Sequence, residues 1–283
     1  MKKIIGLMLA VLFICGAFAG CKGKESSTST EATTSQGANV TTASDKSLQN
    51  ILDKKVLVFG FDEEFKPMGF KDSSGKHVGF DIDLANEVAK RMNIQIKLQP
   101  IIWDNKIMEL NNKNIDCIWN GFTISDEAKS QILFSDAYMK NNQVLVVLKD
   151  SKYSTKEDLK SKTVALQKGS SASIALDKNK EFKSSVKPIL LNTNLLALNE
   201  LKNKTADAVL MDEIAVNYAI AADKENFRVL EGSFAAEEYG IGFRKGEQAL
   251  CDEIVKQLKA MKADGKLAEI STKWFGKDIT TIQ

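Results

Sequence analysis

Residues 115–129 read IDCIWNGFTISDEAK, and residues 134–138 read FSDAY. The first five residues have the alternating pattern of a β-strand, and Asn120-Gly121 then introduces a glycine, small hydroxyls and a helix start. At such a strand end an α/β sheet exposes free backbone N–H groups to a ligand. The stretch therefore predicts a binding site at the end of a strand.

Strand-like and helix-like segments alternate on both sides of this stretch. We expect strands at 55–61, 94–101 and 115–119, with helices at 81–92 and 104–110. The pattern then restarts, with strands at 143–148, 163–167, 188–191 and 208–211 and helices at 155–160, 195–202 and 213–222. A last strand at 239–244 precedes a long helix with Leu250, Ile254, Leu258 and Met261 on one face. This order predicts parallel α/β sheets in two lobes, with a cleft between them.

The N-terminal residues have the pattern of an export signal. Two lysines precede an apolar stretch over residues 4–19, and Phe18-Ala19-Gly20-Cys21 resembles a bacterial lipobox. We expect a signal peptide at 1–20, a lipid on Cys21 and a Ser/Thr-rich disordered tether at 21–47. The mature protein would then be anchored to the outer face of the cell membrane. The alternative is an ordinary signal peptide with an incidental cysteine.

Charge and cysteine content narrow the functional classes. The net charge is only +2, and the lysines are interleaved with acids, so nothing suggests nucleic-acid binding. Cys117 and Cys251 lack the spacing of a metal site, and we expect two buried thiols rather than a disulfide. His77, the sole histidine, lies in a polar turn where we expect it to be solvated.

Several motifs, in a fixed order, carry a resemblance to a known family. Besides the opening stretch they are GFDEEFKP at 60–67, GFDIDL at 79–84, DAVLMD at 207–212, YGI at 239–241 and WFG at 274–276. Together they resemble the bacterial extracellular solute-binding proteins of family 3, of the glutamine- and histidine-binding type, which serve ABC importers. The resemblance implies a two-lobed periplasmic-binding-protein type II fold with two crossing hinge strands. Lobe 1 would comprise 48–141 plus 238–283, and lobe 2 would comprise 142–237.

The resemblance also implies a set of ligand-binding residues. Phe65 and Trp103 match the aromatic residues that sandwich the ligand side chain, and Asp212 matches the carboxylate that accepts the α-ammonium. The Gly169-Ser170-Ser171 turn would bind the α-carboxylate opposite Thr123. The remaining expected ligand residues are Asp62, Asn120, Gly121, Gln167 and Met211.

Three of these residues have a second interpretation. Trp103 could be a core anchor at a helix start, and Asp212 could be a helix N-cap. Asp62 could contact the ligand or cap the turn after the first strand. The sequence leaves these alternatives open.

Position 128 departs from the family pattern. Ala128 stands where the family has the arginine that clamps the α-carboxylate, and an alanine offers neither charge nor a planar fork. Either the carboxylate is held more weakly, or the ligand lacks one, or binding is lost. Lys129 and Lys168 are the cations that the sequence suggests as substitutes.

The predicted function is capture of a polar or aromatic amino acid, or a close derivative of one, and its delivery to a membrane permease. The protein would act as a monomer, without a cofactor or metal and without catalysis. The first alternative is an enzyme resembling cyclohexadienyl dehydratase, for which Asp62, Glu63 or Glu64 would supply the general acid. The second is a lipoprotein that presents its ligand to a separate receptor.

Overall fold

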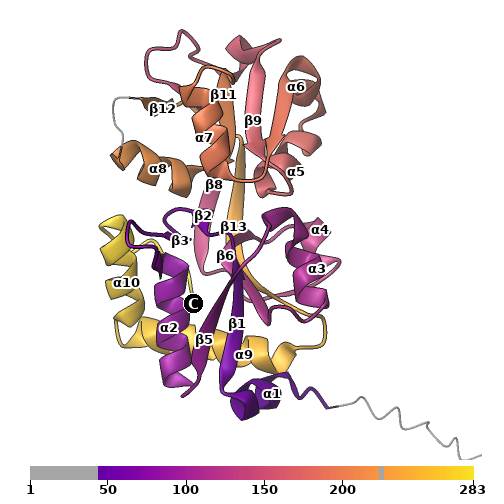
Figure 1. Cartoon of the computed structure of the whole chain (residues 1–283), viewed down its shortest axis with the longest axis vertical. Coiled ribbons are helices and arrows are strands. Elements are labelled where there is room, and N and C mark those ends of the chain that lie inside the picture. Colours follow the sequence, from indigo (N-terminus) through magenta and orange to yellow (C-terminus); the bar gives the residue numbers. More distant parts are fainter. Residues whose placement is uncertain (1–43, 223–225) are drawn as a thin grey trace, which may run out of the picture. The chain divides into compact units, whose positions relative to one another are not determined.

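The structure is a computed structural model that describes residues 44–222 and 226–283. Figure 1 shows two lobes joined by two long strands. The expected signal peptide, Cys21 and nearly all of the expected tether lie outside the described residues. Among the residues described, no helix combines the length and apolar character needed to cross a bilayer.

Lobe 1 contains the first strands and the C-terminal helices. In chain order its elements are α1 (Ser47–Lys54), β1 (Val56–Phe61), β2 (Glu64–Phe65), β3 (Gly69–Lys71), β4 (His77–Val78), α2 (Phe80–Arg91), β5 (Gln95–Pro100), the 3₁₀ helix η1 (Trp103–Asn105), α3 (Lys106–Asn111), β6 (Cys117–Thr123), α4 (Asp126–Lys129), β7 (Leu133–Phe134), α9 (Gln248–Ala263) and α10 (Lys266–Phe275).

Lobe 2 contains the central part of the chain. Its elements are the 3₁₀ helix η2 (Lys156–Leu159), β9 (Thr163–Gln167), α5 (Ser171–Lys178), α6 (Lys180–Ser185), β10 (Lys187–Leu191), α7 (Asn194–Lys202), β11 (Ala208–Asp212), α8 (Glu213–Ala222) and β12 (Phe227–Val229).

Two long strands, β8 (Met139–Leu148) and β13 (Ala235–Phe243), connect the lobes. The strand order is β10-β9-β11-β8-β13-β6-β1-β5. Pairing is parallel for β1 with β5 and β6 and for β9 with β10 and β11, whereas β8 pairs antiparallel with β11 and β13. The predicted lobe boundaries, 141/142 and 237/238, lie within these two strands.

Apolar stripes on the lobe 1 helices explain how they pack. In α9, Leu250, Ile254, Leu258 and Met261 recur at helical spacing, and each is at most 1% exposed. Burial of a side chain of this size contributes roughly 1.5–3 kcal/mol. The expected face of this helix is therefore its core face.

Polar caps place helix starts at the ends of the lobe 2 strands. Ser170 follows β9, and its Oγ accepts a hydrogen bond from the Ser173 N–H at 3.3 Å to begin α5. Thr193 follows β10 and caps α7 in the same way, accepting from Leu196 N–H at 3.2 Å. Because β9 and β10 are parallel, these helix starts share one edge of the sheet.

The structure corrects several boundaries. β6 continues through Asn120-Gly121 to Thr123, because β13 pairs with it as far as the register Tyr239 with Thr123. Residues 156–159 form a 3₁₀ helix rather than an α-helix. The folded part also begins before residue 48, because the Ser47 hydroxyl accepts a hydrogen bond from Leu250 N–H at 3.1 Å and is buried there.

The two described cysteines agree with the buried-thiol interpretation. Cys117 lies in β6 and Cys251 in α9, and both are free and buried. Burial raises the pKa of the Cys251 thiol to about 12. These side chains therefore fill the core of lobe 1 as small apolar groups.

Candidate functional site

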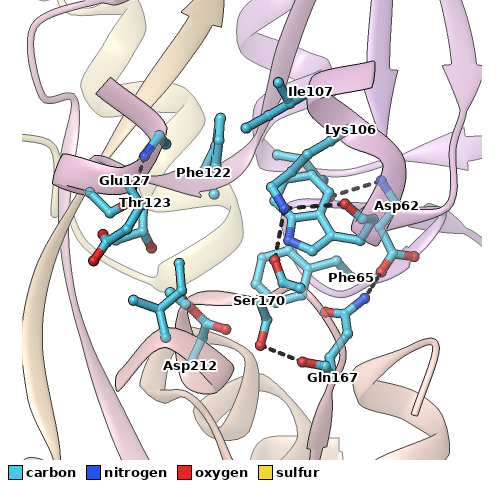
Figure 2. Close-up of a pocket in the computed structure, with 18 of the residues that line it drawn as sticks. Asp62, Phe65, Lys106, Ile107, Phe122, Thr123, Glu127, Gln167, Ser170 and Asp212 are labelled. Atoms are coloured by element: carbon cyan, nitrogen blue, oxygen red, sulfur yellow. Dashed lines mark hydrogen bonds between the residues drawn. The ribbon is translucent and has the colours of Figure 1, made fainter. Parts of the chain in front are cut away.

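A pocket between the lobes gathers nearly all the predicted ligand residues (Figure 2). Lobe 1 contributes Asp62, Phe65, Trp103, Asn120, Gly121, Thr123 and Ala128, and lobe 2 contributes Gln167, Ser170, Ser171 and Asp212. Met211 is the exception. It is 1% exposed and packs in the hydrophobic core. Successive residues of a strand point to opposite faces, so Met211 points away from the face on which Asp212 meets the pocket.

Phe65 and Trp103 form apolar walls of the pocket. Both side chains are buried, and Trp103 also packs edge-on against Phe122, with ring centroids 5.5 Å apart. Trp103 is therefore a core residue and a pocket residue at once. Gly121 permits this arrangement, because its φ of +56° is left-handed and a Cβ there would lie 2.8 Å from the Phe65 ring.

The Asp212 carboxylate lies at the centre of a buried hydrogen-bond network. Its Oδ1 accepts hydrogen bonds from Tyr239 Oη at 2.6 Å, Asn141 Nδ2 at 2.9 Å and Gln143 Nε2 at 2.9 Å. The same two amides donate to Glu237 Oε1, at 2.6 and 2.8 Å. The carboxylate is thus held by side chains from β8 and β13 rather than serving mainly as a helix cap.

Burial raises the pKa of the Asp212 carboxyl well above its usual range, and the charge of Glu237 raises it further, whereas the Tyr239 hydrogen bond opposes this. No Lys or Arg pairs with Asp212 within the described residues. A buried carboxyl of this kind is stabilised in its charged form when a positively charged group lies beside it.

Asp62 caps the turn after the first strand and also lines the pocket. Its Oδ1 accepts a hydrogen bond from the Glu64 N–H at 2.9 Å, which fixes the turn after β1. Its Oδ2 accepts one from Gln167 Nε2 of lobe 2 at 2.7 Å, at the pocket wall. Burial raises the pKa of the Asp62 carboxyl.

The opening stretch has a different hydrogen-bond pattern from the one expected. The Gly121 N–H is not free for a ligand, because it donates to Asp81 Oδ2 at 2.8 Å. Among the unpartnered buried side-chain groups of this stretch are Thr123 Oγ1 and Asn120 Nδ2, which have no hydrogen-bond partner in the described part of the chain. Both residues line the pocket, so their polar groups are candidates for ligand contacts.

The pocket wall contains a cation that the sequence did not suggest. Lys168 pairs with Asp104 at 2.8 Å, and neither Lys168 nor Lys129 is a pocket-lining residue. Lys106 does line the pocket, and it is 8% exposed. Its spacing from Trp103, one helical turn, is the signal that would have found it. Glu127 is a second lining residue that was not expected.

Polar contacts join the two lobes across the pocket. Besides Gln167 with Asp62, Lys106 Nζ donates to Gly169 O at 2.7 Å, and Glu127 pairs with Lys178 at 2.9 Å. Gly169 lies so close to lobe 1 that a Cβ on it would be 2.4 Å from Asp104 Oδ1. The structure therefore represents a conformation in which the lobes touch around the pocket.

The residues considered for acid catalysis lie mostly elsewhere. Glu63 binds Lys71 at 2.7 Å and His77 at 2.9 Å, and neither Glu63 nor Glu64 lines the pocket. His77 is not solvated as expected, because it is half-buried between Glu63 and the edge-on Phe61 ring. In residues 44–222 and 226–283, no group of three or more His, Cys, Asp or Glu side chains is arranged to hold a metal.

The chain is similar in sequence and in structure to amino-acid-binding proteins of ABC transporters. A glutamine-binding protein of an ABC transporter from Bacillus subtilis is 34% identical, over 98% of this chain and 99% of that protein. The structure resembles a substrate-binding protein of an ABC uptake transporter from Streptococcus pneumoniae with bound histidine, with a TM-score of 0.81 and 37% identity over 84% of this chain and 98% of that one.

A third similar protein bears on the enzyme alternative. It is an ancestral amino-acid-binding protein described as a precursor of cyclohexadienyl dehydratase, with a TM-score of 0.74 and 34% identity over 81% of this chain and 99% of that one. The family model of the bacterial extracellular solute-binding proteins, family 3, matches residues 57–277. The predicted family and two-lobed fold are confirmed, and the chain belongs to the bacterial extracellular solute-binding proteins of family 3.

Proposed function

We propose that this protein captures a free amino acid between its lobes and delivers it to the permease of an ABC importer. The observation that carries the proposal is the Asp212 carboxylate, which is buried at the pocket wall and hydrogen-bonded by three neutral side chains. An α-ammonium would supply the missing charge and one further donor. The aromatic walls of Phe65 and Trp103 would hold the ligand side chain.

The charges of the pocket indicate what kind of amino acid fits. Asp62 and Asp212 have no cationic partner within the described residues, and Lys106 has no carboxylate partner there, whereas Glu127 is paired with Lys178. A zwitterion with a polar side chain at Asp62 and Gln167 matches this distribution. A cationic side chain would match it best, because it would also compensate Asp62.

The N-terminal sequence supports a location on the outer face of the membrane. We propose that the chain is secreted, that Cys21 is lipidated, and that residues 22–43 connect the lipid to the folded part on the outer face of the membrane. Neither lobe needs a second copy to complete the pocket, which supports a monomer. A Cys21→Ser variant should be released into the medium or periplasm, which fractionation would measure.

A thermal-shift panel of the twenty amino acids tests the binding function. We expect one or a few of them to raise the melting temperature of the soluble domain in a concentration-dependent way. If no amino acid raises it, whereas decarboxylated or amidated analogues do, the ligand is not a free amino acid.

The enzyme alternative has one supporting observation. Asp62 is an acid at the pocket wall whose pKa is raised by burial, as a general acid requires. Incubation with prephenate and arogenate tests this alternative. Turnover would identify a dehydratase, and the absence of product with intact amino-acid binding would support the importer role.

A further inference from the structure

Ala128 stands where the family pattern has an arginine, and the pocket wall around it also contains Lys106. Ala128 is 6% exposed and lines the pocket from α4, in one apolar cluster with Trp103 and Phe122. The side chain of Lys106 lies over the same two rings, with its Nζ 4.9 Å from the Trp103 centroid and 5.6 Å from the Phe122 centroid. Position 128 and Lys106 therefore belong to the same wall.

The Lys106 ammonium is buried but has no carboxylate partner in the described part of the chain. It donates hydrogen bonds to two carbonyls, Trp103 O at 3.2 Å and Gly169 O at 2.7 Å. An ammonium has three N–H donors, so one remains for a ligand. Figure 2 shows Lys106 extending into the centre of the pocket, toward the segment that carries Ser170.

Other charges near the pocket are already paired or lie at a different position. Asp104 attracts Lys106 electrostatically, but its carboxylate is bound by Lys168 at 2.8 Å. Glu127 is paired with Lys178, and Asp62 accepts its hydrogen bonds from neutral donors. Burial lowers the pKa of Lys106 to about 8, as expected for a cation without a close counter-charge.

The surroundings of the ammonium suit an anion. Gly169 O holds Lys106 beside the start of α5, where backbone N–H groups and the helix dipole favour negative charge. Thr123 Oγ1, buried and without a hydrogen-bond partner among the described residues, lines the same pocket. A cation, a helix N-terminus and a free hydroxyl together form a site for a carboxylate.

We propose that the Lys106 ammonium binds the α-carboxylate of the ligand and replaces the guanidinium that is absent at position 128. This inference rests on the proposed function, because it assumes an amino-acid ligand. A lysine acts as a point charge and does not impose the planar two-bond geometry of a guanidinium. The site would therefore also accept anionic groups of other shapes, such as a phosphonate, in place of the carboxylate.

The test compares each amino acid with its α-amide in wild type, Lys106→Met and Lys106→Arg. The ligands are L-glutamine, L-arginine, L-histidine and their α-amides, titrated by calorimetry at about pH 6.5, where the α-ammonium is protonated. Wild type should prefer the acid. Lys106→Met should lose roughly 10- to 100-fold in affinity for the acid but much less for the amide, and Lys106→Arg should keep the preference.

A structural role for Lys106 would give a different result. If Lys106 acts only by holding Gly169, Lys106→Met weakens acid and amide equally, and the proposal is overturned. Lys129→Met, a lysine outside the pocket, should leave both affinities unchanged. If none of the twenty amino acids of the thermal-shift panel and none of the amides binds to wild type, the proposed function itself fails, whereas equal binding of an acid and its amide by wild type overturns only the role of Lys106.

Discussion

The two ends of the pocket are built in different ways. At the end proposed to bind the ligand ammonium, Asp212 is held by side chains from β8 and β13, the strands that join the lobes. At the end proposed to bind the ligand carboxylate, Lys106 stands at the start of α3 and depends on Gly169 of the other lobe for its shortest hydrogen bond. One end is fixed by the sheet, and the other is completed only when the lobes touch.

The two ends of the pocket therefore depend differently on closure of the lobes. The proposed ammonium site can exist before the lobes close, because its network comes from strands that are already hydrogen-bonded to each other. The proposed carboxylate site needs contributions from both lobes, so a ligand with a carboxylate would favour the closed form. Closure of this kind depends on a higher affinity for the closed conformation.

Replacement of Asp212, the residue proposed to bind the ligand ammonium, should have the largest effect on affinity. We expect Asp212→Asn to weaken amino-acid binding at least about 100-fold, because a buried ion pair with the ligand is lost. The folded-state pKa of Asp212 lies above its unfolded value, so the stability of the empty protein falls as pH rises through the folded-state pKa. The variant should therefore melt no lower than wild type at about pH 7.

Calorimetry and thermal melting of the same samples measure both effects. Asp177→Asn, an exposed residue of α5, is the control and should change neither quantity. Retention of wild-type affinity by Asp212→Asn would show that Asp212 does not face the ammonium.

An arginine at position 128 should take over the role proposed for Lys106. We expect Ala128→Arg to restore at least about 10-fold of the acid affinity lost in Lys106→Met, because a guanidinium can bind a carboxylate from the same wall. When Lys106 is present, Ala128→Arg should increase the affinity for the acid by a smaller factor. No recovery by a folded double variant would mean that position 128 does not face the ligand carboxylate.

Interference with lobe contact should affect mainly the carboxylate end. In Gly169→Ala the new Cβ would meet Asp104, at 2.4 Å in the present conformation, so we expect a loss of about 10-fold in affinity. Gly75→Ala is a matched control, because Gly75 also has a left-handed φ but has nothing within 4 Å of its Cβ position. Both should lose roughly 1–2 kcal/mol of stability, and only Gly169→Ala should lose affinity. Equal affinities would contradict the tight lobe contact.

The smallest effect should come from the ion pair at the rim. Glu127 and Lys178 are both about half exposed, with side-chain exposures of 49% and 58%. Exposed pairs contribute at most about 1 kcal/mol, so Glu127→Gln should change the affinity by no more than roughly fivefold. Titrations at low and high salt check this, since a larger or salt-independent effect would place Glu127 on the ligand.

Much of the fold and the pocket was predictable because the motif residues lie at the ends of strands. Ser170, Thr123 and Asp212 each stand at or just after such an end, where parallel sheets bring loops together. Met211, also expected among the ligand residues, instead packs in the hydrophobic core, and strand alternation already places it on the opposite face from Asp212. The DAVLMD motif at 207–212 alone does not show which of its side chains faces the pocket.

Lys106 could not be assigned in the same way. A lysine on an amphipathic helix usually extends its ammonium into water, so the sequence indicates a solvated residue. Its direction is set by Gly169, which is 63 residues away in the sequence and lies in the other lobe. The free groups on Asn120 and Thr123 also depend on tertiary contacts, because the Asp81 side chain takes the Gly121 N–H.

A crystal structure of the protein with its amino acid bound tests the central claim most directly. We expect the ligand ammonium within hydrogen-bond distance of Asp212 and a carboxylate oxygen about 3 Å from Lys106 Nζ, with Phe65 and Trp103 beside the ligand side chain. A ligand whose carboxylate points away from Lys106, or whose ammonium lies away from Asp212, would contradict the account.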